Sequence, residues 1–172
     1  MLIELTEWSE IELGKVKPKF EEVSLAHLVY EILGNLRGDI LNKKLKTNVN
    51  VSSSLNINCD RTLIGVVLTH VLENSIGYSF SEGNLNIEAE RKENQVTLKI
   101  IDYGMGMVKE KVDLLNQIET KKSELWSRLK CTPCLDVIIC REIMKMHGGS
   151  IQFSSQPDKG TTVYLNFSET GS

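Results

Sequence analysis

The amino-acid sequence predicts an α/β fold, a two-layer α/β sandwich in which three helices cover one face of a mixed sheet. In three long segments, apolar residues recur every three or four positions, a spacing typical of helices that bury one face. Other segments alternate apolar and polar residues, as half-buried strands do. Two pairs of these strands are joined by short turns, so we expect part of the sheet to be antiparallel.

Composition favours one compact domain. The 172 residues are 41% hydrophobic, which is enough apolar material for a single core. The 20 basic and 23 acidic residues give a net charge of -3, so we expect no nucleic-acid partner. The sequence has neither a membrane-spanning apolar run nor a signal peptide. We therefore expect a cytoplasmic chain without membrane contact, whether alone or as a piece of a membrane-anchored protein.

The N-terminal region is predicted to contain two helices. Residues 1 to about 14 have the apolar spacing of an amphipathic helix, and an extended link through Pro18 follows. Ser24 is suited to an N-cap, and the apolar stripe behind it predicts a helix that continues to about Lys44. This helix is the first of the three that we expect on the sheet.

The middle of the chain is predicted to contain a strand and the second long helix. Residues 47–51 alternate as a short strand, and residues 52–58 have the composition of a polar loop. Asp60 is a plausible N-cap for a helix that ends near Ser79. Its apolar side is formed by Leu63, Ile64, Val67, Leu68, Val71 and Leu72.

Two hairpins are predicted in the second half of the chain. Alternating segments over 84–91 and 95–102 form the first, and those over 150–155 and 161–167 form the second. Between them, we expect a short helix over 108–118, a polar irregular stretch over 119–132, and the third long helix over 133–147.

The four cysteines are expected to be free thiols. Cys131 and Cys134 have the spacing of a redox pair or of half a zinc site. A redox pair needs a preceding strand, and a zinc site needs a second ligand pair. Neither context is evident in the sequence.

One polar row interrupts the apolar pattern of the second long helix. His70, Asn74 and Tyr78 are four residues apart, so they lie on one face at successive turns. They can be the solvent-facing edge of an amphipathic helix. Alternatively, the side-chain oxygen of Asn74 can bind Mg²⁺, a hard cation that takes oxygen ligands.

An acid and two glycines follow the strand predicted over 95–102. Gly104 and Gly106 allow positive φ and a close approach of the backbone to a ligand after Asp102. An ionised carboxylate can accept a hydrogen bond from an exocyclic amine such as that of adenine. An ordinary strand-to-loop turn can have the same sequence, so both interpretations stay open.

Three motifs follow one another in the chain: His70-x-x-x-Asn74, Asp102-x-Gly104-x-Gly106, and His147-Gly-Gly149 with Gly160-Thr161. In this order they resemble the N, G1 and G2 boxes of the ATP-binding catalytic domain of sensor histidine kinases, a Bergerat-type fold shared with gyrase and MutL ATPases. Residues 17–172 are similar to this catalytic domain. Residues 1–16 resemble the end of the dimerisation helix and the linker that precede it in such kinases.

The resemblance implies a role for each motif residue at the phosphate end of the site. Asn74 would hold the Mg²⁺ that bridges the phosphates of ATP, and it is therefore both the expected metal ligand and a catalytic residue. His70, one turn earlier, would assist it as the second catalytic residue.

The remaining motif residues are expected to bind the adenosine part of ATP. Asp102 would accept a hydrogen bond from the adenine amino group, and Gly104 and Gly106 would shape the pocket. Tyr78 matches the aromatic residue beside the adenine. Thr161 would support Asp102.

The chain departs from the family pattern twice, both times at the phosphate end. Gly77 stands where the family has a lysine, which removes a charge-assisted contact. Residues 132–136, Thr-Pro-Cys-Leu-Asp, replace the family's Gly-x-Gly-x-Gly phosphate loop. Pro133 has no N–H to offer a phosphate, and Asp136 adds a negative charge. We expect weakened binding of the triphosphate.

Two functions are candidates. The first is the catalytic domain of a sensor histidine kinase, which transfers the γ-phosphoryl of Mg-ATP to a histidine outside this chain and thence to a response regulator. The second is a degenerate kinase-like module with little or no ATP turnover, which acts by nucleotide binding or protein docking. In either case the partners would include the dimerisation and phosphoacceptor domain of the same protein, and this chain alone would be monomeric.

Overall fold

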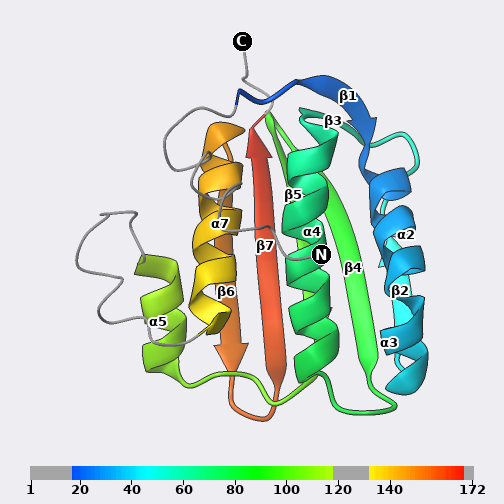
Figure 1. The fold of residues 1–172 in the computed structure, drawn as a ribbon, viewed down its shortest axis with the longest axis vertical. Coiled ribbons are helices and arrows are strands. Elements are labelled where there is room, and N and C mark those ends of the chain that lie inside the picture. Colours follow the sequence, from blue (N-terminus) through cyan, green and yellow to red (C-terminus); the bar gives the residue numbers. More distant parts are fainter. Residues whose placement is uncertain (1–16, 118–131, 169–172) are drawn as a thin grey trace.

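A five-stranded mixed sheet forms one layer of the fold (Figure 1). The computed structural model describes residues 17–117 and 132–168, so the helix predicted over 1–14 and nearly all of the stretch 119–132 lie outside the described residues. The sheet order is β2-β4-β5-β7-β6, in which only β2 and β4 are parallel neighbours. The strands are β2 (Lys46–Asn50), β4 (Asn84–Lys92), β5 (Gln95–Asp102), β6 (Ser150–Gln156) and β7 (Gly160–Ser168). Both predicted hairpins are confirmed.

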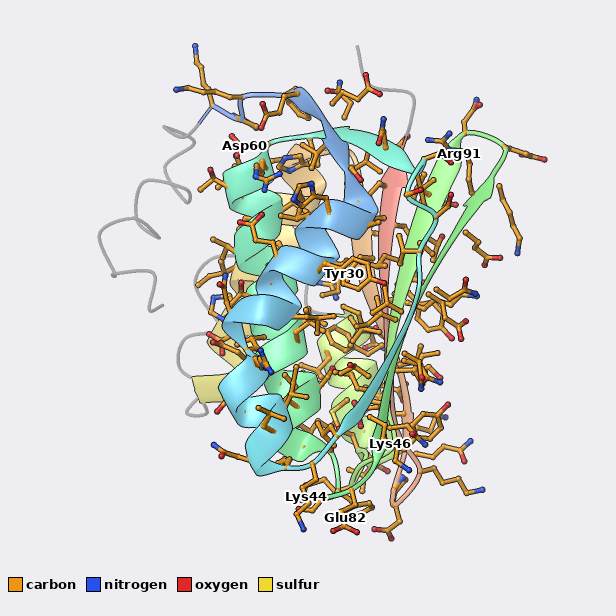
Figure 2. The ribbon with its side chains drawn as sticks, turned by 90° about the vertical axis from the view of Figure 1, so that its right-hand side faces the viewer. Tyr30, Lys44, Lys46, Asp60, Glu82 and Arg91 are labelled. Carbon is orange, nitrogen blue, oxygen red and sulfur yellow. The ribbon has the colours of Figure 1, made fainter. Side chains whose placement is uncertain are left out.

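Helices cover one face of this sheet and leave the other face open, as Figure 2 shows in side view. The three long helices are α2 (Leu25–Asn35), α4 (Arg61–Tyr78) and α7 (Thr132–Met146). The shorter α3 (Arg37–Asn42) continues the direction of α2, and α5 (Lys109–Gln117) lies against the edge strand β6. The predicted two-layer α/β sandwich is confirmed. Within the described ranges, every helix is too short or too polar to cross a membrane.

The hydrophobic core fills the space between the two layers. Inward residues of β4, β5 and β7 meet the apolar faces of α2, α4 and α7 there. Its largest fully buried side chains are Leu25, Ile64, Leu68, Leu72, Leu85, Ile87, Leu98, Ile100, Ile143, Met144, Ile151 and Leu165. Helix α4 is packed against α2, α7 and β5. These contacts fix the positions of the polar residues on α4 that do not face the core.

The single helix predicted from Ser24 to about Lys44 is in fact two helices. Ser24 caps α2 as expected, with its hydroxyl accepting from the N–H of His27 at 3.4 Å. The break falls at Leu36, whose φ and ψ of -92° and 9° belong to neither helix. Gly34 and Asn35 precede the break, and both are poor helix formers.

A second, two-stranded sheet was not predicted. Its strands β1 (Glu21–Ser24) and β3 (Asn56–Cys59) pair antiparallel, although the sequence predicted an extended link and a polar loop at these positions. Asparagine alternates with Ile57 and Cys59 in β3, and only these two residues point into the core. The strand forms because β1 pairs with it, a long-range contact that local composition does not reveal.

Asp60 joins three parts of the chain at the start of α4 (Figure 2). Its Oδ1 accepts from the N–H groups of Thr62 and Leu63, each at 3.0 Å, as predicted for an N-cap. Its Oδ2 accepts from the Lys19 N–H at 2.8 Å. Its own N–H donates to Nε2 of the buried His147 at 3.0 Å, and Nδ1 of that ring donates to the Ile143 carbonyl at 2.7 Å. The linker, α4 and α7 are therefore tied at one end of the molecule.

Replacing Asp60 by alanine is expected to lower the free energy of unfolding by about 2 kcal/mol, because the cap and the bond to Lys19 are lost together. Burial raises the pKa of Asp60, but its backbone hydrogen bonds outweigh this and hold the pKa below its ordinary value of 3.8. The ionised carboxylate therefore stabilises the fold above pH 3.8, and this contribution disappears as the pH falls through the lowered folded pKa.

Urea denaturation of wild type and Asp60→Ala at pH 7 and at pH 2 to 3 measures this effect. The difference between the two proteins should be largest at pH 7 and shrink in acid. A difference that is independent of pH would contradict the role assigned to the carboxylate.

Candidate functional site

Helix α4 carries the predicted polar row into a cavity. His70, Asn74 and Tyr78 all line it, each one turn after the last. His70 and Asn74 are half-buried, whereas Tyr78 is 42% exposed at the end of the helix. Among the described residues, none hydrogen-bonds to the Asn74 amide, so its oxygen is free to meet a ligand. The row is therefore part of a cavity wall.

Asp102 ends β5 in the same cavity and is almost completely buried, with 3% of its surface exposed. Its Oδ1 accepts from the N–H groups of Gly104 at 3.1 Å and Thr161 at 3.2 Å. No described residue donates to Oδ2. Burial raises the pKa of Asp102, and the two backbone hydrogen bonds oppose the rise. One oxygen is thus fixed by the protein and the other is left for a ligand.

The two glycines after Asp102 are required by close packing of the backbone. Gly104 pairs with Ser79, and a Cβ on Gly104 would lie 1.9 Å from the Tyr78 carbonyl oxygen. Gly106 has a φ of 61°, and a Cβ there would lie 1.9 Å from the Gln156 carbonyl oxygen. Positive φ, which we expected of both, is found at Gly106 only. Gly106 lines the cavity, whereas Gly104 holds the loop against α4.

Thr161 lines the cavity from β7 and is held in place by Ser155 of β6. The two hydroxyl oxygens are 2.9 Å apart. The Ser155 hydroxyl donates to the Gly160 carbonyl at 2.8 Å and accepts from the Met107 N–H at 2.8 Å. Because a hydroxyl has one hydrogen, the Thr161 hydroxyl must be the donor in their shared bond. Ser155 thus connects both strands of the second hairpin to the glycine loop.

The cavity is small and mostly apolar away from its polar rim. Its volume is about 120 Å³, close to that of an engineered cavity of about 150 Å³ that accepts benzene. The apolar walls are formed by Val71, Met105, Met107, Leu115, Val137, Cys140, Ile151, Phe153 and Val163. A flat aromatic ring fits such a space. A charged group attached to that ring would have to extend out of the cavity, because the apolar walls do not solvate it.

The other end of the cavity lies between α4 and α7. Helix α7 begins at Thr132, so the segment that replaces the expected phosphate loop is the start of a helix. Asp136 follows in its second turn, with Oδ1 3.9 Å from Nδ1 of His70. At Gly77, no atom beyond its own stretch of helix lies within 4 Å of the position of a Cβ, so the described residues leave room for a side chain at the position where the family has a lysine.

Lys43 closes the C-terminal end of α4. Its Nζ donates to the carbonyls of Gly77 and Ser79, the latter at 2.9 Å. A cation at this end of a helix satisfies carbonyls that have no partner within the helix. The end of α4 that carries Tyr78 is therefore anchored from the C-terminal end of α3.

The geometry and the order of these motifs match a known family. The model of the histidine kinase-, DNA gyrase B-, and HSP90-like ATPases matches residues 59–171. The chain belongs to this ATPase family. The match begins just before α4 and includes every predicted site residue.

Relatives of this ATPase domain share its fold. The sensor-like histidine kinase SenX3 of Mycobacterium tuberculosis is 23% identical over 165 residues, 96% of this chain and 40% of SenX3. The solved structure of Acinetobacter baumannii histidine kinase AdeS has a TM-score of 0.76 at 24% identity, covering 95% of this chain and 74% of that one. Histidine kinase ThkA in complex with response regulator TrrA has a TM-score of 0.70 at 20% identity, covering 97% and 48%. The chain spans between a fifth and two fifths of the length of the curated relatives SenX3 and the Caulobacter vibrioides non-motile and phage-resistance protein.

Sequence reasoning missed several residues of the ATPase domain's cavity. Lys111 of α5 is the only lysine or arginine among the described residues that line it. Ser155, which supports Thr161 without lining the cavity, was also missed, although the predicted hairpin places it opposite Thr161. No spacing in the sequence indicated Lys111, because α5 reaches the cavity through tertiary contacts with β6 and α7.

The free-thiol prediction is confirmed for the two cysteines whose side chains are described. Cys59 and Cys140 are buried and unpaired. Burial raises the pKa of each to about 12, so both are inert as nucleophiles at neutral pH. Cys131 lies outside the described residues. Within the described part of the ATPase domain, no group of three histidine, cysteine or acidic side chains is placed to hold a metal.

Proposed function

We propose that this ATPase domain is the catalytic part of a sensor histidine kinase. The observation that carries the proposal is the pairing of a buried carboxylate that has one free oxygen, on Asp102, with the polar row of α4 in one cavity. The Asp102 carboxylate can recognise a base, and the polar row lies where the phosphate tail of a bound nucleotide would leave the cavity. Family membership and the similarity to histidine kinases support it.

In this proposal the adenine ring enters the small cavity. The free Oδ2 of Asp102 accepts a hydrogen bond from the adenine amino group, and Gly106, whose positive φ turns the loop, shapes the cavity beside the ring. Thr161 acts through Asp102, whose Oδ1 it helps to fix. Tyr78, half-exposed at the mouth, packs beside the ring. Gly104 positions this loop without touching the ligand.

The phosphate end would be handled by α4. The free amide oxygen of Asn74 fits Mg²⁺, a hard cation that prefers oxygen ligands. When bound, Mg²⁺ neutralises negative charge on the phosphates. His70, one turn earlier, orients the phosphate tail beside Asn74. Phosphoryl transfer depends mainly on such positioning and charge neutralisation, so the γ-phosphoryl would be presented to a histidine outside this chain.

The partners follow from the same proposal. Residues 1–16 would be the end of a dimerisation helix and its linker, and residues 17–172 the catalytic domain. The phosphoacceptor histidine would belong to the dimerisation domain of the same protein, and a response regulator would receive the phosphoryl group. The solved complex of histidine kinase ThkA with response regulator TrrA supports a partner of this kind. We place the domain in the cytoplasm and expect the chain alone to be monomeric.

A second candidate is a degenerate module that keeps the nucleotide pocket and has little or no turnover. Residues 132–136 support it, because α7 begins where the phosphate loop is expected and Asp136 contacts His70. Gly77 supports it as well, since it supplies no cation.

The two candidates differ in one outcome, transfer of label from γ-labelled Mg-ATP to a dimerisation domain supplied in trans. A kinase will label the histidine of that domain, and Asn74→Ala should abolish labelling while the variant still melts as wild type does. Binding of ATP with no labelled histidine would favour the degenerate module. Absence of any nucleotide binding would contradict the kinase and favour a degenerate module that acts by protein docking alone.

A further inference from the structure

Among the described residues that line the cavity, acidic side chains outnumber basic ones. The acidic and basic side chains among its described lining residues are Asp102, Asp136 and Lys111. Two carboxylates thus face one ammonium group, and one of them, Asp102, lies at the base end with Oδ1 bonded to the protein and Oδ2 left for the base. Sites that bind phosphate groups normally present an excess of cations or free N–H groups. Each added phosphate therefore gains little from this lining.

Asp136 lies beside the route that a phosphate tail would take. Helices α4 and α7 run side by side (Figure 1), and Asp136 Oδ1 is 3.9 Å from His70 Nδ1 across that interface. Asn74, the proposed phosphate-end residue, is one turn further along α4. The Asp136 side chain is 34% exposed, so water screens it only in part. A terminal phosphate that reaches Asn74 must approach this carboxylate.

The start of α7 compensates weakly for this charge. The first four N–H groups of a helix have no partner within it and can bind an anion. In α7 they belong to positions 132–135, and Pro133 has no N–H to offer. The helix therefore presents fewer donors than the glycine loop it replaces.

We infer that this site binds ADP more tightly than ATP, and that ADP regulates the proposed kinase by competing for the adenine cavity. The inference rests on the proposed adenine site. ATP differs from ADP by its third phosphate, and this phosphate would approach Asp136 with few cations or N–H groups to compensate. The preference for ADP therefore arises from repulsion between the third phosphate and the Asp136 carboxylate. The proposed kinase would then be active only at a high ratio of ATP to ADP.

Isothermal titration calorimetry with adenosine, ADP and ATP at constant Mg²⁺ tests this directly. Wild type should bind ADP about tenfold more tightly than ATP. Asp136→Asn should reduce this ratio to about twofold by strengthening ATP binding, since the asparagine has the same shape without the charge. Glu110→Gln, an exposed acid on α5 outside the cavity lining, should leave the ratio unchanged. Raising the salt concentration should also narrow the ratio in wild type, because charge repulsion is screened.

The possible outcomes separate the inference from the proposed function. ATP binding as tight as ADP binding in wild type would overturn the inference and leave the adenine site intact. An unchanged ratio in Asp136→Asn would overturn the cause assigned to it. Failure of adenosine, ADP and ATP alike to bind would overturn the proposed function itself.

Discussion

Replacing Asp102 by asparagine is expected to weaken adenine nucleotide binding by about a hundredfold, equivalent to about 3 kcal/mol. The asparagine Oδ1 can still accept from the Gly104 and Thr161 N–H groups. Its amide nitrogen then replaces the free Oδ2 and turns a donor toward the adenine amino group, which is itself a donor. Titration calorimetry with ADP measures the loss.

The same substitution should leave the unliganded domain as stable as wild type, or make it more stable. Burial raises the folded pKa of Asp102 above its ordinary value of 3.8. A raised carboxyl pKa gives a contribution to stability that is present below pH 3.8 and is lost as the pH rises through the folded pKa. Asparagine removes this dependence. Wild type should therefore lose stability relative to Asp102→Asn as the pH is raised from about 3 to 7.

The control for Asp102→Asn is Asp158→Asn, the same chemical change on the exposed turn between β6 and β7. Asp158 has a φ of 59°, which asparagine tolerates well. The nucleotide affinity of Asp158→Asn should equal that of wild type. Equal affinity of Asp102→Asn and wild type would contradict the assigned adenine contact, and a large loss of stability would contradict the account of the buried carboxylate.

Replacing Gly104 by alanine is expected to lower the free energy of unfolding by about 3 kcal/mol. The new Cβ would lie 1.9 Å from the Tyr78 carbonyl oxygen and 2.8 Å from the Ser79 Cα. Both are backbone atoms, so the clash is relieved only if the loop moves away from α4. That movement would also break the hydrogen bond from the Met105 N–H to the Tyr78 carbonyl.

Urea denaturation measures this change, with Gly65→Ala as the matched control. Gly65 lies within α4 and has no atom within 4 Å of the position of a Cβ. Alanine should raise stability there by about 0.5 to 1 kcal/mol, because it favours the helix. If Gly104→Ala were as stable as Gly65→Ala, the close packing of the loop against α4 would be wrong.

The sequence predicted the elements whose signals are local. The cap at Asp60, the helix behind it and both hairpins follow from spacing and turn chemistry, and the structure confirms them. The break at Leu36 was missed because the apolar stripe of α2 continues across it into Ile40. The β1–β3 sheet was missed because its pairing joins residues far apart in the chain.

The site was predictable where a motif carries its chemistry. His70, Asn74, Tyr78, Asp102, Gly106 and Thr161 line one cavity, and their roles there remain a proposal. The sequence also predicted that Gly104 has to be a glycine. The structure gives a different reason from the predicted one, because Gly104 packs the loop against α4 and does not line the cavity. Lys111, Ser155 and the contact between His70 and Asp136 depend on how elements pack together. Only the pairing of Ser155 with Thr161 follows from the hairpin register, and no spacing in the sequence encodes the other contacts.

The most direct test of the central claim, that adenine binds on Asp102, is an NMR titration of the isotope-labelled domain with ADP. The amide signals of Gly104 and Thr161 report on it, because both N–H groups donate to Asp102 Oδ1. We predict that both signals shift together and saturate with a single dissociation constant, and that in Asp102→Asn the same shifts require about a hundredfold more ADP. Saturation by ADP with neither signal moving, or no response to ADP at any residue, would contradict the account.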